Sequence, residues 1–329
     1  MKRRFLPAFC LLFLALFLAV TAQAKQIVLK VAYTNVPEHP QGEAFPLFKK
    51  AVEERSRGEI KVELYDNGKF GNYDSNMQGL QMGVLALAAE STSNYSVYNP
   101  KLQIFDIPYL VPSFAAAERI LDGKIGQELS DALARNNVFA FGYMHQGFRS
   151  IFSNRPIRRL EDARGLKIRT TPSKVEIATM KALGMNPTPV AWGEVYTALQ
   201  QKTVDGINID FNLAYVNKFY EVCKYVTLTQ TSYYPHMILM SKRFWQTLTP
   251  QQQKIVRTAF DECVAFERKR CIENVAAFRK QMEAKGLTVI ELPPEELARW
   301  QKAVADIGRE FENIIPHAFQ EEVAAAVRQ

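Results

Sequence analysis

A single uninterrupted helical pattern, from 250 to 285, sets the scale of this fold. Thr249 is a favourable N-cap, Pro250 suits the first helical position, and Gln252 completes a capping box. Gly286 supplies the stop signal. At 1.5 Å per residue, about 36 residues span about 54 Å, which exceeds one small lobe. We therefore predict one helix that crosses two lobes, because its apolar positions do not keep the strict heptad of a coiled coil.

The rest of the chain alternates between strand-like and helical segments. The stretch 26–33 is predicted to be a strand, 42–57 a helix and 59–65 a second strand, which is a β-α-β opening. Further strands are expected at 85–89, 137–143, 147–153, 166–170, 204–209 and 234–240. This pattern indicates an α/β fold of two lobes, and in such folds ligands bind in the cleft beyond the carboxyl ends of the strands.

The two lobes are expected to exchange chain segments. We assign 25–146 and about 235–270 to lobe I, and 147–234 and about 271–329 to lobe II. Hinge strands and the long helix would join them.

The first 24 residues are typical of an export signal. Lys2, Arg3 and Arg4 precede an apolar run, and 22–24 (AQA) is a small-x-small cleavage site. The alternative is an uncleaved membrane anchor. A cleaved signal predicts a periplasmic protein, and its removal lowers the formal charge from +7 to +4.

The remaining composition argues against several other functions. Basic and acidic side chains are interspersed along helical stretches, which indicates solvated faces and no nucleic-acid partner. Four histidines show no metal-ligand spacing, so no metal or cofactor is expected. Of the three mature cysteines, Cys223 could pair with Cys263 or Cys271, or all three could be buried thiols.

Two arginines lie among strand residues and need an acidic partner. Arg149 lies in 147–150, and Arg169 ends the strand 165–169. A guanidinium matches a carboxylate with two parallel hydrogen bonds. Each arginine is therefore a candidate for ligand binding, and the alternative is a structural salt bridge to a protein carboxylate.

An ordered series of short segments gives the sequence a family resemblance. The segments are 165–169 (GLKIR), 182–189 (ALGMNPTP), 194–200 (EVYTALQ), 204–206 (VDG) and 218–222 (KFYEV). With them, essentially the whole mature chain resembles the solute-binding proteins of TRAP (tripartite ATP-independent periplasmic) transporters, of the dicarboxylate-binding DctP type. The resemblance implies a two-lobed periplasmic-binding-protein fold, a small carboxylate ligand, a membrane permease as partner, and a monomer.

The resemblance also implies roles for individual residues. Arg169 would form the main salt bridge to the ligand carboxylate, and Arg149 would assist it. Trp192 would close over an apolar part of the ligand, with core packing as the alternative. Glu90 falls at a position that often lines the cleft, with a structural carboxylate as the alternative. Weaker candidates on the loops and helix starts of the first lobe are Glu38, His39 and Tyr73.

One segment departs from the family pattern. Many members have an amide that touches the ligand where this chain has Ile209, with Asn208 and Asp210 beside it. If Asp210 faced the cleft, it would repel a second carboxylate and favour an ammonium group. The alternative is that Asp210 caps a turn. Phe211 and Tyr234, with the tryptophan above, would suit an apolar or aromatic ligand body.

Together these features predict a secreted receptor for a small organic carboxylate, with an amino-acid-like or aromatic monocarboxylate favoured. A periplasmic sensor that presents the same ligand to a membrane receptor is the second possibility. A secreted enzyme is the third, and the chain has no Gly-x-Ser-x-Gly, His-Glu-x-x-His or Cys-x-x-Cys motif to support it.

Overall fold

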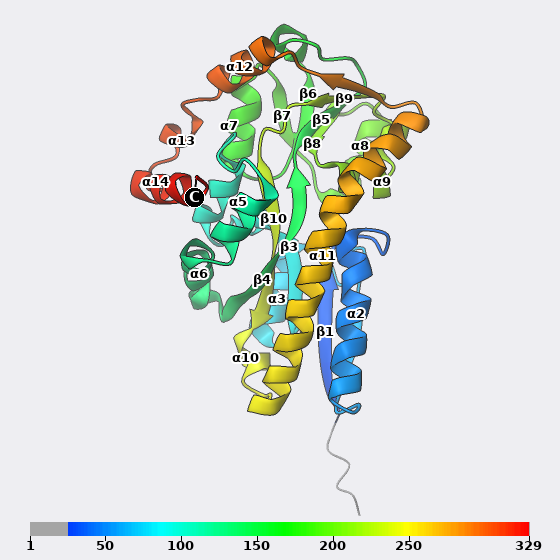
Figure 1. Cartoon of the computed structure of the whole chain (residues 1–329), viewed down its shortest axis with the longest axis vertical. Coiled ribbons are helices and arrows are strands. Elements are labelled where there is room, and N and C mark those ends of the chain that lie inside the picture. The colour runs from blue at the N-terminus through cyan, green and yellow to red at the C-terminus, as the bar shows by residue number, and fades with distance from the viewer. Residues whose placement is uncertain (1–25, 329) are drawn as a thin grey trace, which may run out of the picture.

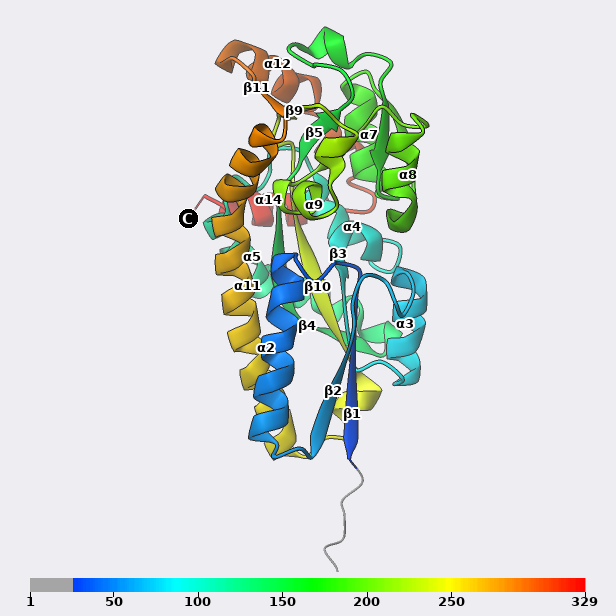
Figure 2. The same cartoon turned by 90° about the vertical axis from the view of Figure 1, so that its right-hand side faces the viewer.

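The long helix α11, Pro250–Ala284, runs along both halves of an elongated molecule in the computed structural model, which describes residues 26–328 (Figures 1 and 2). Its start is the predicted capping box: Gln252 N donates to Thr249 Oγ1 at 3.3 Å, and Thr249 N donates to Gln252 Oε1 at 3.0 Å. Near this end Phe260 packs edge-on against Phe48, and towards the other end Phe278 stacks on Tyr215 at 4.1 Å. The prediction of one helix crossing two lobes is thus confirmed.

Two sheets form the two lobes, which confirms the α/β two-lobed fold. The first sheet has the strand order β2-β1-β3-β10-β4, with β2 Ile60–Tyr65, β1 Ile27–Tyr33, β3 Leu87–Ser91, β10 Tyr233–Ser241 and β4 Val138–Phe148. The second has the order β11-β9-β5-β8-β6-β7, with β11 Thr288–Glu291, β9 Tyr225–Leu228, β5 Ser150–Ser153, β8 Gly206–Ile209, β6 Lys167–Thr170 and β7 Asn186–Pro189.

Helices cover both sheets. Around the first lie α2 Pro40–Arg55, α3 Tyr73–Met82, α4 Thr92–Tyr95, α5 Phe114–Leu121, α6 Lys124–Asp131 and α10 Lys242–Trp245. The later helices are α7 Lys174–Ala182, α8 Val195–Gln200, α9 Phe211–Val216, α12 Pro294–Ala303, α13 Ile307–Glu310 and α14 His317–Ala326. Short 3-10 helices are η1 Pro100–Asp106, η2 Ala134–Asn136, η3 Leu160–Ala163, η4 Trp192–Glu194 and η5 Phe219–Glu221.

The last helix, α14, packs back onto α5 and α6, the helices that follow η1. Arg119 donates to the Val327 carbonyl at 3.1 Å, and Lys124 pairs with Glu322 at 2.9 Å. The C-terminal segment therefore contacts the first lobe as well as the second. The lobe boundaries given above stay a proposal.

Two strand segments cross between the sheets side by side. β4 continues through Arg149 into β5, and β9 returns through 229–232 into β10. Arg149 N donates to the Ser232 carbonyl at 2.8 Å, and Thr231 N donates to the Arg149 carbonyl at 3.0 Å. These paired crossings, together with α11, connect the two lobes.

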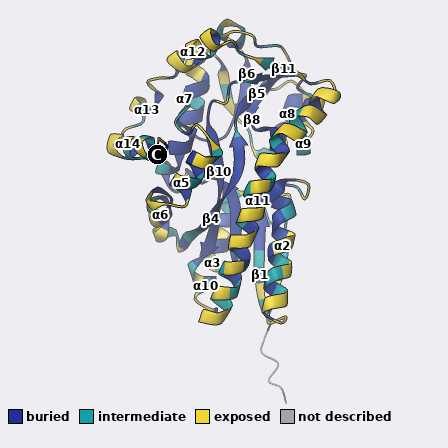
Figure 3. Cartoon of the chain, in the orientation of Figure 1, coloured by how far each residue is buried: buried dark blue, intermediate teal, exposed yellow. Residues whose placement is uncertain are grey.

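The buried residues are concentrated in the two sheets. The strands are largely buried, whereas the outward faces of the helices are exposed (Figure 3). Cys223, Cys263 and Cys271 are buried free thiols, which matches the second of the two alternatives for the cysteines. Within 26–328 no helix combines the length and apolar character needed to cross a membrane. The predicted export signal, 1–24, lies outside the described residues.

Candidate functional site

A cavity of about 600 Å³ lies between the two lobes, at the strand ends. β1 and β3 are parallel neighbours, with Tyr33 opposite Ala89, so Thr34 and Glu90 reach the same edge of the first sheet. Lining side chains from the first lobe include Thr34, Asn67, Asn72, Tyr73, Glu90 and Asn94, and those from the second include Arg169, Val190, Trp192, Tyr196, Asn217 and Phe219. A site at the carboxyl ends of strands is what the fold predicts.

A smaller pocket of about 30 Å³ adjoins the main cavity. The two share Thr34, Glu90, Asn94, Arg169 and Trp192. The smaller pocket adds polar and aromatic groups from the crossing strands and their neighbours, including Asn35, Gln146, Arg149, Tyr234 and His236.

Arg169, on β6, has a guanidinium without an acidic partner. Its Nε and Nη2 both donate to the Val190 carbonyl, at 3.1 and 3.0 Å, and it forms no ion pair with any described residue. The side chain is only 4 % exposed, and burial lowers its pKa to about 10, so it stays a cation at neutral pH. The Trp192 ring lies 5.6 Å from the guanidinium carbon. An incoming carboxylate could therefore use Nη1 and the remaining Nη2 hydrogen.

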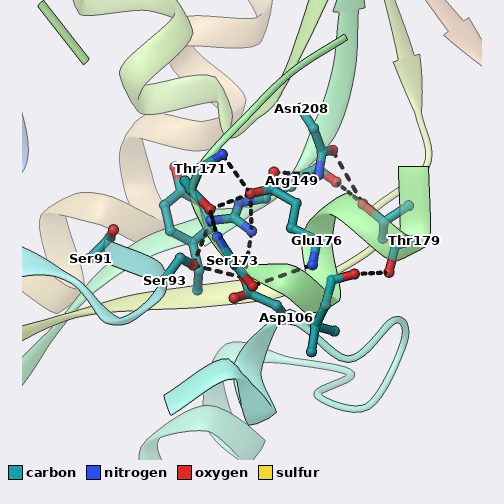
Figure 4. A network of polar contacts seen from close by, with 12 residues as sticks. Ser91, Ser93, Asp106, Arg149, Thr171, Ser173, Glu176, Thr179 and Asn208 are labelled. Atoms are coloured by element: carbon teal, nitrogen blue, oxygen red, sulfur yellow. Dashed lines mark hydrogen bonds and ion pairs between the residues drawn. The ribbon is translucent and has the colours of Figure 1, made fainter. Parts of the chain in front are cut away.

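Arg149, by contrast, is bound to the protein itself (Figure 4). Its Nη1 lies 2.6 Å from Asp106 Oδ1 and 3.6 Å from Glu176 Oε2, and its Nη2 donates to Ser93 Oγ at 2.9 Å. Burial disfavours its charge, but Glu176 and Asp106 outweigh that effect and raise its pKa. The Tyr234 ring covers the guanidinium at 3.9 Å. Arg149 lines the smaller pocket, yet its charge is already neutralised by two buried carboxylates.

Glu90 stands on the cavity wall formed by the first lobe. It is 3 % exposed, and its Oε1 accepts from Ser91 N at 2.8 Å and from Asn94 Nδ2 at 3.0 Å. Burial raises its pKa to about 7, although these hydrogen bonds and the charge of Arg169 oppose the shift. Tyr73 and the half-buried Trp192 also line the main cavity.

The structure does not bring Asp210 to either cavity lining. Its side chain caps α9, where Oδ1 accepts from Leu213 N at 3.0 Å, and Oδ2 accepts a hydrogen bond from the Tyr234 hydroxyl. Burial raises its pKa to about 6, and the hydrogen bond from Tyr234 opposes the shift. Asp210 thus has the capping role that the sequence left open, and an ammonium-binding role is without geometric support. Tyr234 lines the smaller pocket.

Four other predicted contacts also lie away from the two linings. Asn208 Nδ2 donates to Glu176 at 3.4 Å, and Phe211 packs edge-on against Phe152. His39 is the N-cap of α2, where Nδ1 accepts from Gln41 N, and burial lowers its pKa to about 3. Glu38 is exposed on the preceding loop. Asn208 lies in β8, and His39 is occupied as a helix cap, which the short segments around them did not reveal.

Several lining residues were missed by sequence reasoning. Asn67, Asn72 and Asn217 come from loops and helix ends, and Gln146 and His236 come from the crossing strands. The one usable signal was the polar pair Thr34–Asn35 directly after the first strand. Within residues 26–328, no group of three or more His, Cys, Asp or Glu side chains is arranged to hold a metal ion.

Comparisons with known proteins agree with this architecture. Residues 31–313 match the DctP family, described as bacterial extracellular solute-binding protein, family 7. The 2,3-diketo-L-gulonate-binding periplasmic protein YiaO of Escherichia coli is 30 % identical over 263 residues, covering 80 % of each chain. A solute-binding protein of Verminephrobacter eiseniae is 33 % identical over 304 residues, covering 92 % of this chain and 90 % of the relative.

Solved structures extend the likeness to ligand complexes. The sugar acid binding protein DctPAm of Advenella mimigardefordensis, in complex with galactonate, superposes with a TM-score of 0.89 at 29 % identity, covering 93 % of this chain and 99 % of that one. A TRAP periplasmic solute-binding protein of Shewanella oneidensis with bound succinate gives 0.88 at 28 % identity, with coverages of 92 % and 99 %. The match over 31–313, the two relatives and these structures together show that the chain belongs to the DctP family of bacterial extracellular solute-binding proteins.

Proposed function

We propose that the protein is the periplasmic receptor of a TRAP transporter, that it binds a small organic acid through one carboxylate, and that it delivers this acid to a membrane permease. Family membership supports the role in solute binding. The observation that carries the proposal is the unpaired guanidinium of Arg169 in a cavity of about 600 Å³, a volume typical of small-ligand sites.

The charges around the cavity favour a single carboxylate. Arg169 is available to an anion, whereas Arg149 already pairs with Asp106 and lies near Glu176. A second carboxylate on the ligand would find no further unpaired cation in the described lining. An ionised group that leaves water without a partner costs free energy, so a monocarboxylate fits better than a dicarboxylate.

The remaining lining suits a ligand body with hydroxyl groups. Amide side chains of Asn67, Asn72, Asn94 and Asn217 can both donate and accept hydrogen bonds. Trp192, Tyr196 and Phe219 offer ring faces to the carbon skeleton. The related structures with galactonate, with D-erythronate and with density attributed to pantoate fit this chemistry, although two other related structures hold succinate. Within that range we favour a hydroxy acid over the amino-acid-like ligand considered from the sequence.

Closure of the lobes would couple binding to transport. The cavity is lined from both lobes, so a ligand that contacts both walls stabilises the closed state. The paired crossings at 148–150 and 229–233 and the helix α11 are the connections that would bend. The permease would then recognise the closed form and release the solute. We propose that the solute leaves chemically unchanged.

A melting-temperature screen tests the proposal. The probes are galactonate, D-erythronate, pantoate, galacturonate and succinate, with amino acids as a second group. We expect a hydroxy monocarboxylate to raise the melting temperature most. In Arg169→Lys we expect that stabilisation to disappear while the unliganded melting temperature stays near wild type, because the planar fork is lost but the fold is kept. Mass spectrometry of the released probe should show an unchanged mass.

Arg309→Lys is the matched control, because Arg309 is a surface residue whose one ion-pair partner among residues 26–328 is Asp306. It should respond to the probes as wild type does. Equal stabilisation of wild type and Arg169→Lys would contradict the proposed site. A larger shift with succinate than with every monocarboxylate would contradict the proposed ligand class.

A further inference from the structure

We propose that the protein binds its organic anion together with one proton, which Glu90 takes up as the anion enters the cavity. This inference rests on the proposed function, since it needs an anion at Arg169. Solute and proton would then leave the cavity together when the lobes open.

The position of Glu90 makes it the group that meets the incoming charge. It is the single carboxylate in the described linings of both the main cavity and the smaller pocket, and Arg169 is shared by the same two linings. Both of its hydrogen bonds are made by Oε1, from Ser91 N and Asn94 Nδ2. Oε2 has no hydrogen-bond partner among the described residues, so it is the oxygen available to hold a proton.

The electrostatics of the cavity wall already bring this carboxyl close to its protonated form. Burial raises the pKa of Glu90 to about 7, and the charge of Arg169 is one of the effects that limit this rise. An anion paired with Arg169 cancels that effect and adds a negative charge to the same enclosed space. Two carboxylates that share a site cannot both stay ionised without a large cost, so one of them takes up a proton. A carboxylate in direct contact with a guanidinium keeps its charge, so the proton goes to Glu90.

Among the described residues, no other group around Glu90 is suited to this role. The titratable and charged groups that share a cavity lining with Glu90 or act on its charge are Arg169 on β6, Arg149 between β4 and β5, Tyr73 on α3, Tyr95 on α4, Tyr196 on α8, and Tyr234 and His236 on β10. Burial raises the pKa of Tyr73, Tyr95 and Tyr234 and lowers that of His236, and a hydrogen bond to Glu221 raises the pKa of Tyr196, so all five stay neutral near pH 7. Arg149 stays charged beside its two carboxylates.

The test is calorimetric titration at pH 8.0 in phosphate, HEPES and Tris, which differ in their enthalpy of ionisation. The probe is the acid of the five-member panel above that raises the melting temperature most. The slope of the observed binding enthalpy against the ionisation enthalpy of the buffer gives the number of protons that the protein takes up per molecule bound. We expect uptake of roughly half a proton or more per molecule bound, and affinity about 5- to 20-fold weaker at pH 8.5 than at pH 6.5, if the anion raises the pKa of Glu90 by one to two units.

Glu90→Gln keeps the shape and both acceptor contacts but cannot titrate. We expect it to bind with no proton uptake and with affinity independent of pH. The exposed Glu310→Gln is the matched control and should keep the wild-type uptake. Uptake that persists in Glu90→Gln would overturn the assignment to this residue.

The calorimetric titrations of the wild-type protein in the three buffers test proton uptake even if Glu90→Gln folds poorly. Binding with no proton exchange, or with proton release, overturns the inference and leaves the proposed function standing. Failure of every panel acid to bind overturns the proposed function, and the inference with it.

Discussion

Replacing Arg149 with methionine should show whether this arginine is a structural or a ligand-binding group. Arg149→Met removes a buried cation and leaves Asp106 and Glu176, both nearly inaccessible, without their partner. Loss of one partner of a buried ion pair typically costs about 3–5 kcal/mol, because the other charge stays buried. The pair at 2.6 Å and the hydrogen bond to Ser93 both disappear, so we expect a loss of this size in the free energy of unfolding.

Urea denaturation at pH 7.5 and pH 5.0 is the assay. Protonation of the abandoned carboxyls relieves their repulsion, so the loss should shrink at the lower pH. The control is Arg309→Met, whose ion pair with Asp306 lies on the surface with both side chains at least 75 % exposed. That variant should lose no more than about 1 kcal/mol. If Arg149→Met unfolded like wild type but bound the panel acid about 100-fold more weakly, the structural role assigned to Arg149 would be refuted.

Two other residues give separate predictions. Glu267 is fully buried on α11, and burial raises its pKa to about 8. The folded state therefore keeps a proton that the unfolded state loses above about pH 4.5. The free energy of unfolding falls as pH rises between these two values. Glu267→Gln should thus be more stable than wild type at pH 8, by about 1–4 kcal/mol, and equal to it at pH 4. A thermal scan that shows the same gain in stability at pH 8 and at pH 4 would contradict this prediction. Asp210→Ala should lower the melting temperature, because the side chain that caps α9 is lost. It should leave the affinity for the panel acid within about threefold of wild type, because Asp210 does not line the cavity. A large change in affinity measured by calorimetry would restore Asp210 to the ligand site.

The sequence predicts an element of the fold correctly where residues close together in the chain determine that element. The start of α11 carries its own signals in Thr249 and Gln252, and both hydrogen bonds of the capping box are present. The strands at 137–143 and 147–153 were predicted separately, but β4 runs on to Phe148 because it pairs with β10 through a register shift at Tyr234 and Pro235. Such irregular pairing depends on a partner about 90 residues away, which no local pattern encodes.

The site could be predicted only in part, for a similar reason. Arg169 follows from its place at the end of a strand and from the family resemblance, and the structure places it in the cavity without an acidic partner. The acids beside Arg149 lie far from it in the sequence, Asp106 on η1 and Glu176 on α7. The residues next to Arg149 in the sequence therefore could not reveal these ion-pair partners. Asp210 and His39 were both candidates for the cleft, yet each caps a helix. The hydrogen bond from the helix backbone already occupies the acceptor atom of the side chain.

A crystal structure of the protein with a bound panel acid tests the central claim most directly. We predict one carboxylate with its two oxygens within about 3 Å of Nη1 and Nη2 of Arg169, while Nε stays on the Val190 carbonyl and Arg149 stays on Asp106. A structure in which the acid lies elsewhere, with Arg169 bound only to groups of the protein, would contradict the account.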